Sequence, residues 1–93
     1  MISLNTLHIL NKTPEHPRFK ECLSMLGADD ALLLTENGVV ALEGAHNLKA
    51  GRLYALSSDA CARGLGKNPG EAHYVDYTEM VALTLQAQRV ISW

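Results

Sequence analysis

The segment Ser3–Leu10, SLNTLHIL, carries apolar side chains on both sides of an alternating pattern. In an extended chain, Leu4 and Leu10 point to one face of the sheet, whereas Leu7 and Ile9 point to the other. A strand that is apolar on both faces is typical of a parallel sheet covered by helices on each side. The segment therefore predicts a β-strand that is buried on at least one face.

Four further short apolar runs follow this strand and alternate with helical patterns. We predict strands at Ala31–Thr35, Arg52–Ser57, His73–Tyr77 and Arg89–Trp93. Strands that alternate with helices of about ten residues indicate βαβ units. We therefore expect one α/β domain over residues 1–93, with a mostly parallel sheet of four to five strands flanked by helices.

The first predicted helix follows a loop, Asn11–Pro17, whose prolines are suited to a first helical turn. Apolar residues recur at helical spacing from Phe19 to Leu26, and Gly27 stands at the C-cap position. The next segment, Glu36–Leu42, is ambiguous, because its Asn-Gly pair favours a hairpin while a loop leading into a short helix competes.

Two more helices are predicted in the second half of the chain. One begins at the capping pair Ser58-Asp59 and ends at Gly64. The other begins after Asp76, which has the capping-box spacing to Glu79. Its apolar residues form a stripe of the kind that a surface helix buries: Tyr77, Met80, Val81, Thr84 and Leu85.

Composition excludes several classes of function. The chain has a net charge of −2, so it offers no basic surface for direct contact with nucleic acid. Its apolar runs are too short to cross a membrane, and the amino terminus lacks an export signal, which predicts a cytoplasmic location. The chain is 47% hydrophobic and only 19% charged, and this apolar excess predicts a partner, or self-association when the chain is alone.

A ligand would bind at the carboxyl ends of the strands, where the loops Asn11–Pro14, Glu36–Gly38 and Ser57–Asp59 should meet. The glycine-rich segment Gly64–Gly70 lacks both the first glycine and the hydroxyl residue of a P-loop, and we interpret it as a turn. The four histidines, His8, His16, His46 and His73, are scattered, so we expect neither a metal nor a cofactor.

The two cysteines are the remaining candidates for chemistry. Cys22 has Arg18 and Lys20 nearby, which would favour a thiolate, but it also lies on the apolar stripe of the first helix. Burial is therefore the first interpretation for Cys22 and reactivity the second. For Cys61, between two alanines, we expect a place in the core.

Several motifs resemble the DsrH/TusB family, the small subunit of DsrEFH and TusBCD sulfur-relay complexes. Leu7–Pro14 is similar to its "LHxxxxSP" opening, and Ala31–Val39 to its strand followed by "DGV". The later segments match its "YAL…D…ARGL" and "VDYxxFVxLT" motifs and its final tryptophan, at Tyr54–Leu65, Val75–Thr84 and Trp93. Met80 replaces the phenylalanine of the family motif, which is a conservative packing change. The resemblance spans essentially the whole chain.

This resemblance implies a DsrE/DsrF-like fold and decides Glu36–Leu42 against the hairpin. It also implies TusC/DsrF-like and TusD/DsrE-like partners in a dimer of heterotrimers, and a downstream sulfur acceptor protein. The relayed persulfide sulfur would serve 2-thiouridine formation at the tRNA wobble position, or sulfur oxidation in the DsrH branch.

Three hypotheses about function stay open at this point. Cys22 is the candidate persulfide carrier, in which case the chain takes a catalytic part in the relay. Alternatively, the chain is a non-catalytic subunit that shelters the cysteine of a partner. A stand-alone small-molecule-binding α/β module is the alternative from a different class.

Overall fold

A computed structural model describes residues 4–43, 52–65 and 72–93 of the chain. The strands are β1 (Leu4–Leu10), β2 (Ala31–Leu34), β3 (Leu53–Leu56), β4 (His73–Val75) and β5 (Ala87–Ser92). The helices are α1 (Pro17–Ser24), the 3₁₀ helix η1 (Glu36–Glu43), α2 (Ser57–Ala62) and α3 (Tyr77–Gln86). Ser3 of the first predicted strand, His46 and most of the glycine-rich segment lie outside the described residues.

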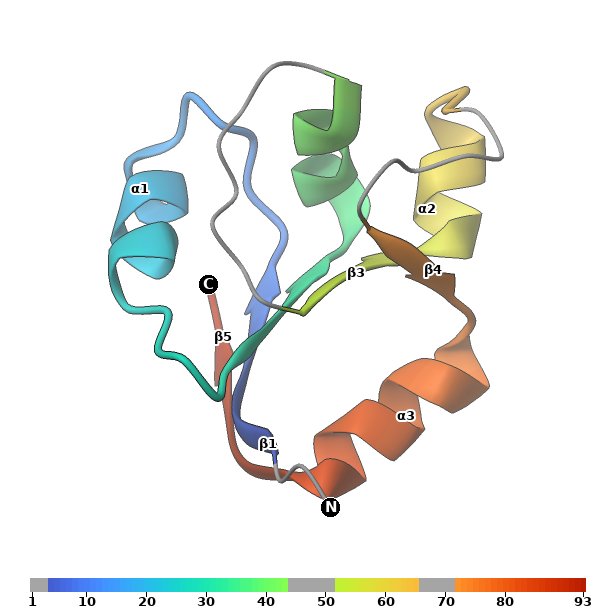
Figure 1. Ribbon diagram of the computed structural model, residues 1–93. Coiled ribbons are helices and arrows are strands. Elements are labelled where there is room, and N and C mark those ends of the chain that lie inside the picture. The colour runs from blue at the N-terminus through green and yellow to red at the C-terminus, as the bar shows by residue number, and fades with distance from the viewer. Residues whose placement is uncertain (1–3, 44–51, 66–71) are drawn as a thin grey trace.

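The strands form one five-stranded sheet in the order β4-β3-β2-β1-β5, and every pairing is parallel. The predicted α/β class and strand number are therefore confirmed. β1 occupies the interior of the sheet, with His8 opposite Leu32 of β2 and Ile91 of β5. The first and last described strands thus lie side by side, as Figure 1 shows.

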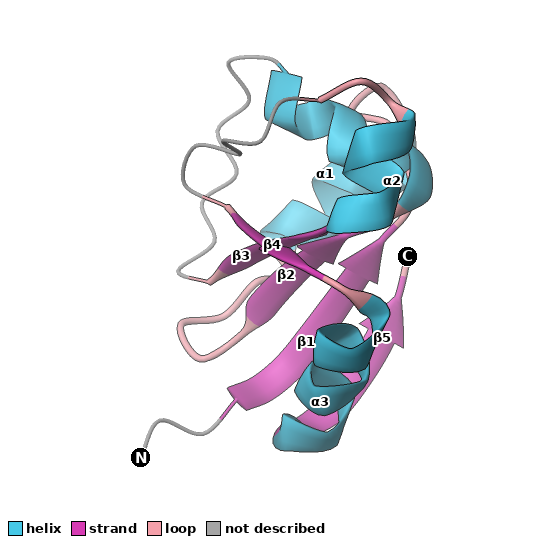
Figure 2. Cartoon of the chain, turned by 90° about the vertical axis from the view of Figure 1, so that its right-hand side faces the viewer, coloured by secondary structure: helices cyan, strands magenta, loops and turns pink. Residues whose placement is uncertain are grey.

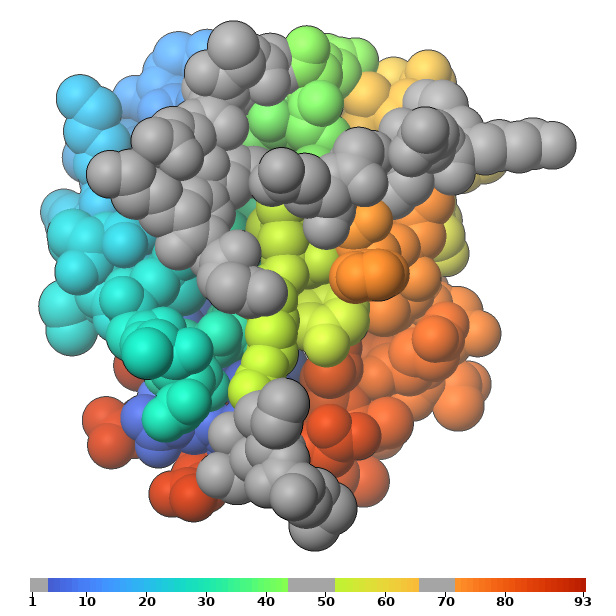
Figure 3. All heavy atoms as spheres, in the orientation of Figure 1, coloured from blue at the N-terminus to red at the C-terminus, as the bar shows by residue number. Residues whose placement is uncertain are grey.

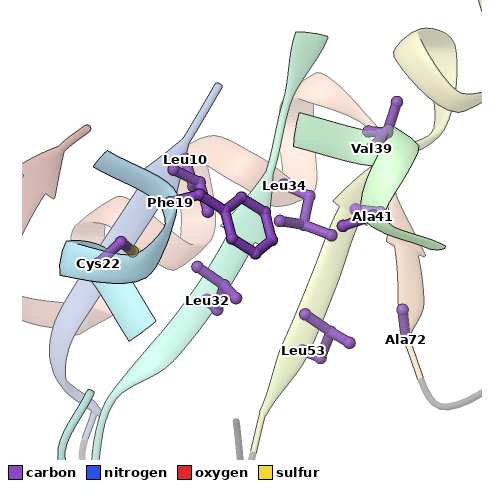
Figure 4. Close-up of a cluster of buried hydrophobic side chains, with 10 residues drawn as sticks. Leu10, Phe19, Cys22, Leu32, Leu34, Val39, Ala41, Leu53 and Ala72 are labelled. Atoms are coloured by element: carbon purple, nitrogen blue, oxygen red, sulfur yellow. The ribbon is translucent and has the colours of Figure 1, made fainter. Parts of the chain in front are cut away.

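Two apolar clusters pack on the two faces of the sheet. α1 and η1 cover one face, where ten buried side chains gather (Figure 4): Leu10, Phe19, Cys22, Leu32, Leu34, Val39, Ala41, Leu53, Ala55 and Ala72. α3 covers the other face (Figure 2), where its Leu83 forms a cluster with Leu4, Leu7, Ala31, Leu33, Leu56 and Val75. Both faces of the inner strands are therefore covered, as is typical of a parallel sheet, whereas β5 at the edge is largely exposed.

The segment after β2 is a 3₁₀ helix and not a hairpin, which confirms the expectation from the family resemblance. Glu36 turns the chain with a positive φ of 49°, and Gly38 then passes directly over the end of β1. A Cβ atom on Gly38 would lie 2.2 Å from the carbonyl oxygen of Leu10. The glycine of the Asn-Gly pair is therefore required by this close backbone contact and not by a hairpin turn, because only glycine leaves room for the contact.

Two predicted helix ends were wrong. α1 ends at Ser24 with Met25 as its C-cap, and the N–H of Gly27 instead donates to the carboxylate of Asp30. α2 begins directly after β3 with Leu56 as N-cap, and its cap makes no side-chain hydrogen bond. Asp59 is therefore not a cap, because its carboxylate is engaged elsewhere. α2 ends at Ala62 with Arg63 as its C-cap, and Gly64 follows with a positive φ of 71°, so the predicted glycine end of this helix is confirmed.

The predicted Asp76–Glu79 capping box is present at the start of α3. The predicted inward stripe of α3, however, was wrong, because Tyr77, Val81 and Leu85 are 59%, 52% and 81% exposed. Leu83 is the buried residue instead, and Met80 packs beside it. The helix fixes which residues share a face, but the direction of that face depends on the sheet beneath it.

We expect Gly38→Ala to lower the free energy of unfolding by roughly 2–3 kcal/mol, because the new Cβ collides with a backbone oxygen that cannot move away alone. The matched control is Gly27→Ala, whose Cβ would meet Asp30 at an ordinary 3.4 Å. Urea unfolding of both variants measures the difference. Equal effects would contradict the close contact.

Candidate functional site

The three loops predicted to meet at the carboxyl ends of the strands do come together. The backbone N–H of Glu36, at the start of η1, donates to the Asp59 carboxylate of α2 at 2.7 Å. A Cβ atom on Gly38 would lie 3.6 Å from the Cα of Asn11, so the second loop also lies against the start of the first. Asp59 therefore links two loops at the ligand side of the sheet.

Cys22 lies on α1 with its side chain directed at the sheet (Figure 4). It has no exposed surface and belongs to the same apolar cluster as Phe19 and Leu32. Burial raises the pKa of the Cys22 thiol to about 12, so the thiolate is scarcely formed at neutral pH. The first interpretation of Cys22, burial in the core, is therefore confirmed.

Cys61, in contrast, is exposed, and the prediction that it belongs to the core was wrong. It lies near the end of α2, where Ala60 is the residue that turns inward. Alanine and cysteine are similarly small and apolar, so the sequence of this one-and-a-half-turn helix cannot show which of them faces the core. The accessible thiol of the described residues is Cys61.

His8 is the centre of a buried hydrogen-bonded network. Its Nε2 lies 2.9 Å from Asp30 Oδ2, and its Nδ1 lies 3.0 Å from the indole Nε1 of Trp93. An indole N–H can only donate, so Nδ1 accepts, and Nε2 carries the proton that is donated to Asp30. Asp30 also accepts from the backbone N–H groups of Thr6 and Gly27. Both nitrogens of His8 are therefore hydrogen-bonded inside the core.

The environment of Asp30 keeps its carboxylate ionised. Burial on its own raises the pKa of Asp30, but the hydrogen bonds from Gly27, His8 and Thr6 lower it more. The net result is a pKa below the ordinary value of 3.8. The structure thus places one fixed negative charge under the Thr6–His8 part of β1.

Trp93 is held at three points and joins the end of β5 to β1. Its ring stacks on His8 with centroids 6.1 Å apart, and its backbone N–H donates to Ile9. Lys12 donates to its carbonyl oxygen at 2.7 Å. The Asp30–His8–Trp93 network was not predicted from the sequence, because its members are far apart along the chain. The tryptophan of the family motif was the signal that could have pointed to it.

The histidine that precedes α1, His16, has a structural role that was not predicted from the sequence. His16 is the N-cap of α1, and its Nδ1 accepts from the backbone N–H of Arg18 at 3.1 Å. Within the described ranges, no group of three or more His, Cys, Asp or Glu side chains is placed to hold a metal ion. No helix in the same ranges is long and apolar enough to span a bilayer.

Comparison with known proteins identifies the family. A family model described as "DsrH like protein" matches residues 12–90 of the chain. The chain belongs to the DsrH family. Two TusB proteins are among its relatives, and the resemblance of the motifs to the DsrH/TusB family is therefore confirmed.

These relatives match the DsrH chain over nearly its whole length. Protein TusB of Escherichia coli O81 is 35% identical over 94 residues, covering 94% of this chain and 99% of the relative. Protein TusB of Salmonella arizonae is 39% identical with the same coverage.

Two solved structures share the fold of this DsrH chain. Protein Tm0979 from Thermotoga maritima superposes with a TM-score of 0.70 at 25% identity, covering 86% of this chain and 91% of the other. The ychN protein from E. coli gives a TM-score of 0.76 at 15% identity, covering 97% and 99%. The second likeness, at this low identity, concerns the fold alone.

We expect the two thiols to differ sharply in reactivity. In the native chain at pH 8, Ellman's reagent should modify Cys61 rapidly and leave Cys22 unmodified until denaturant is added, because Cys22 is buried and its pKa is about 12. Cys61→Ser should abolish the native reaction, and Cys22→Ser should not change it. Fast native modification of Cys22 would contradict its burial.

Proposed function

We propose that this chain is a non-catalytic subunit of a cytoplasmic sulfur-relay complex that leads to 2-thiouridine at the tRNA wobble position. The match to TusB proteins over 94% of the chain carries this proposal. The partners are TusC/DsrF-like and TusD/DsrE-like subunits in a dimer of heterotrimers, which hands sulfur to a downstream acceptor protein. The net charge of −2 argues against direct contact with tRNA.

The state of Cys22 favours a scaffold over a carrier. In a relay step, a thiolate attacks the outer sulfur of a persulfide, a new S–S bond forms, and the donor cysteine leaves as a thiolate. Cys22 has neither exposed surface nor appreciable thiolate, so accepting sulfur would require α1 to move off the sheet. A persulfide carrier at Cys22 is therefore the second candidate for the role of this chain. Sulfur oxidation is the second candidate for the pathway that the complex serves.

The outer face of α3 is the surface that best suits a protein partner. Tyr77, Val81 and Leu85 recur every fourth residue and are more than half exposed, and Val90 of β5 is 42% exposed. Figure 3 shows α3, in orange to red, along the surface of the molecule. The single charged side chain of α3, Glu79, is engaged in the capping box. This uncharged face accounts for part of the apolar excess of the composition and fits an apolar face of a homologous subunit.

We expect Val81→Asp and Leu85→Glu to weaken co-purification with co-expressed TusC-like and TusD-like subunits by roughly tenfold or more, because each buries a charge in an apolar contact. The matched control is Met25→Asp, which changes an equally exposed apolar residue, 60% exposed, near α1. Native mass spectrometry measures the complexes, and thermal unfolding checks the fold. A wild-type chain that stays a monomer and ignores these partners would favour a stand-alone module.

A sulfur-loading experiment separates the scaffold from the carrier. The complex is incubated with a cysteine desulfurase and L-cysteine, and the intact mass of each subunit is measured. We expect no added sulfur on Cys22, since its thiol is buried and protonated. Added sulfur that is lost in Cys22→Ser and kept in Cys61→Ser would show that Cys22 carries a persulfide.

A further inference from the structure

A pocket of about 340 Å³ opens over the amino-terminal half of β1, away from the carboxyl-end loops. Its floor contains Thr6 and His8 of β1, and the loop between α1 and β2 forms one wall, with Asp29. Arg89 of β5 lies on the opposite side, because β1 separates β2 from β5 in the sheet. This volume lies at the lower end of the range of about 300–1,000 Å³ for ligand pockets, and it suits a small ligand.

The floor of the pocket contains a polar side chain with unused hydrogen-bonding capacity. Thr6 is 4% exposed, and its hydroxyl has no hydrogen-bond partner among the described residues. Among the described residues, every fully enclosed side-chain N or O atom has a hydrogen-bond partner. The unpartnered Thr6 hydroxyl is therefore not fully enclosed, and it opens onto the pocket that Thr6 lines. A nearly buried hydroxyl without a partner is costly unless a ligand or water satisfies it.

The rim of the pocket carries opposite charges that do not pair with each other. Arg89 and Asp29 are both exposed, and neither forms an ion pair with a described residue. The ionised Asp30 beneath the floor adds a second negative charge, although its oxygens are engaged by Thr6, Gly27 and His8. With two carboxylates against one guanidinium, a simple anion such as phosphate is disfavoured.

Apolar side chains complete the pocket. Met25, which is 60% exposed, stands at its edge on the α1 side, and the partly buried Ile91 lines it from β5. A ligand that satisfies all these groups has a carboxylate for Arg89, an ammonium for the acidic wall, and a short apolar body between Met25 and Ile91.

We propose that this pocket binds a small zwitterion, a free α-amino acid. Its carboxylate pairs with Arg89 and accepts from the Thr6 hydroxyl, and its ammonium group faces Asp29. The site does not depend on the sulfur-relay proposal, because it uses neither thiol of the chain.

The single tryptophan provides a built-in reporter, because Trp93 donates its indole N–H to His8 in the floor of the pocket. We expect L-leucine, added to the ¹⁵N-labelled full chain, to shift this indole resonance saturably. Two matched probes lack one charge each: 4-methylpentanoate has no ammonium, and 3-methylbutylamine has no carboxylate. Both should bind at least tenfold more weakly than L-leucine.

Variants test each contact separately. Arg89→Gln should weaken L-leucine at least tenfold and remove its advantage over 3-methylbutylamine, whereas Asp29→Asn should remove its advantage over 4-methylpentanoate. Thr6→Val, which keeps the shape and removes the hydroxyl, should weaken binding several-fold. Glu21→Gln, an exposed charge on α1 outside the pocket, is the control and should bind as wild type does.

Three results would overturn the proposal. The first is the absence of a saturable shift with L-leucine at millimolar concentrations. The second is equal binding of the zwitterion and the two singly charged probes. The third is unchanged binding in Arg89→Gln and Asp29→Asn, with the rest of the amide spectrum preserved as evidence of folding.

Discussion

The parallel pairing of β1 with β5 is the contact on which the rest of the structure depends. It joins the two ends of the described chain and makes β1 an interior strand with a neighbour on each side. Parallel strands cannot be joined by a tight turn, so α3 must carry the chain from β4 at one edge of the sheet to β5 at the other. This pairing positions α3 on its face and brings Trp93 to His8.

Burial decides the chemistry of the two thiols. Both cysteines lie on short helices, and neither local sequence shows whether the thiol is exposed. Packing against the sheet removes Cys22 from solvent and raises its pKa to about 12, whereas Cys61 points outward from α2. A cysteine in a family that handles sulfur is therefore not automatically a sulfur carrier, because reactivity requires both access and a thiolate.

The apolar excess of the chain divides between its core and its surface. The two clusters on the faces of the sheet take up most of the leucines, and β2 is fully buried along its length. The exposed stripe of α3 is the part that the core does not use. A helix that is apolar on its outer face is typical of a subunit, and this agrees with the relationship to TusB proteins.

The sequence by itself determined the α/β class, the parallel sheet and the capping box of α3, because these follow from periodicity and local hydrogen bonding. Together with the family motifs, it also indicated the helix after Glu36. Only the tertiary structure decided that Tyr77, Val81 and Leu85 face outward, that Cys61 is exposed, and that His8 joins Asp30 to Trp93. The physical reason is that facing directions and long-range contacts depend on which strands become neighbours, and no local pattern contains that information.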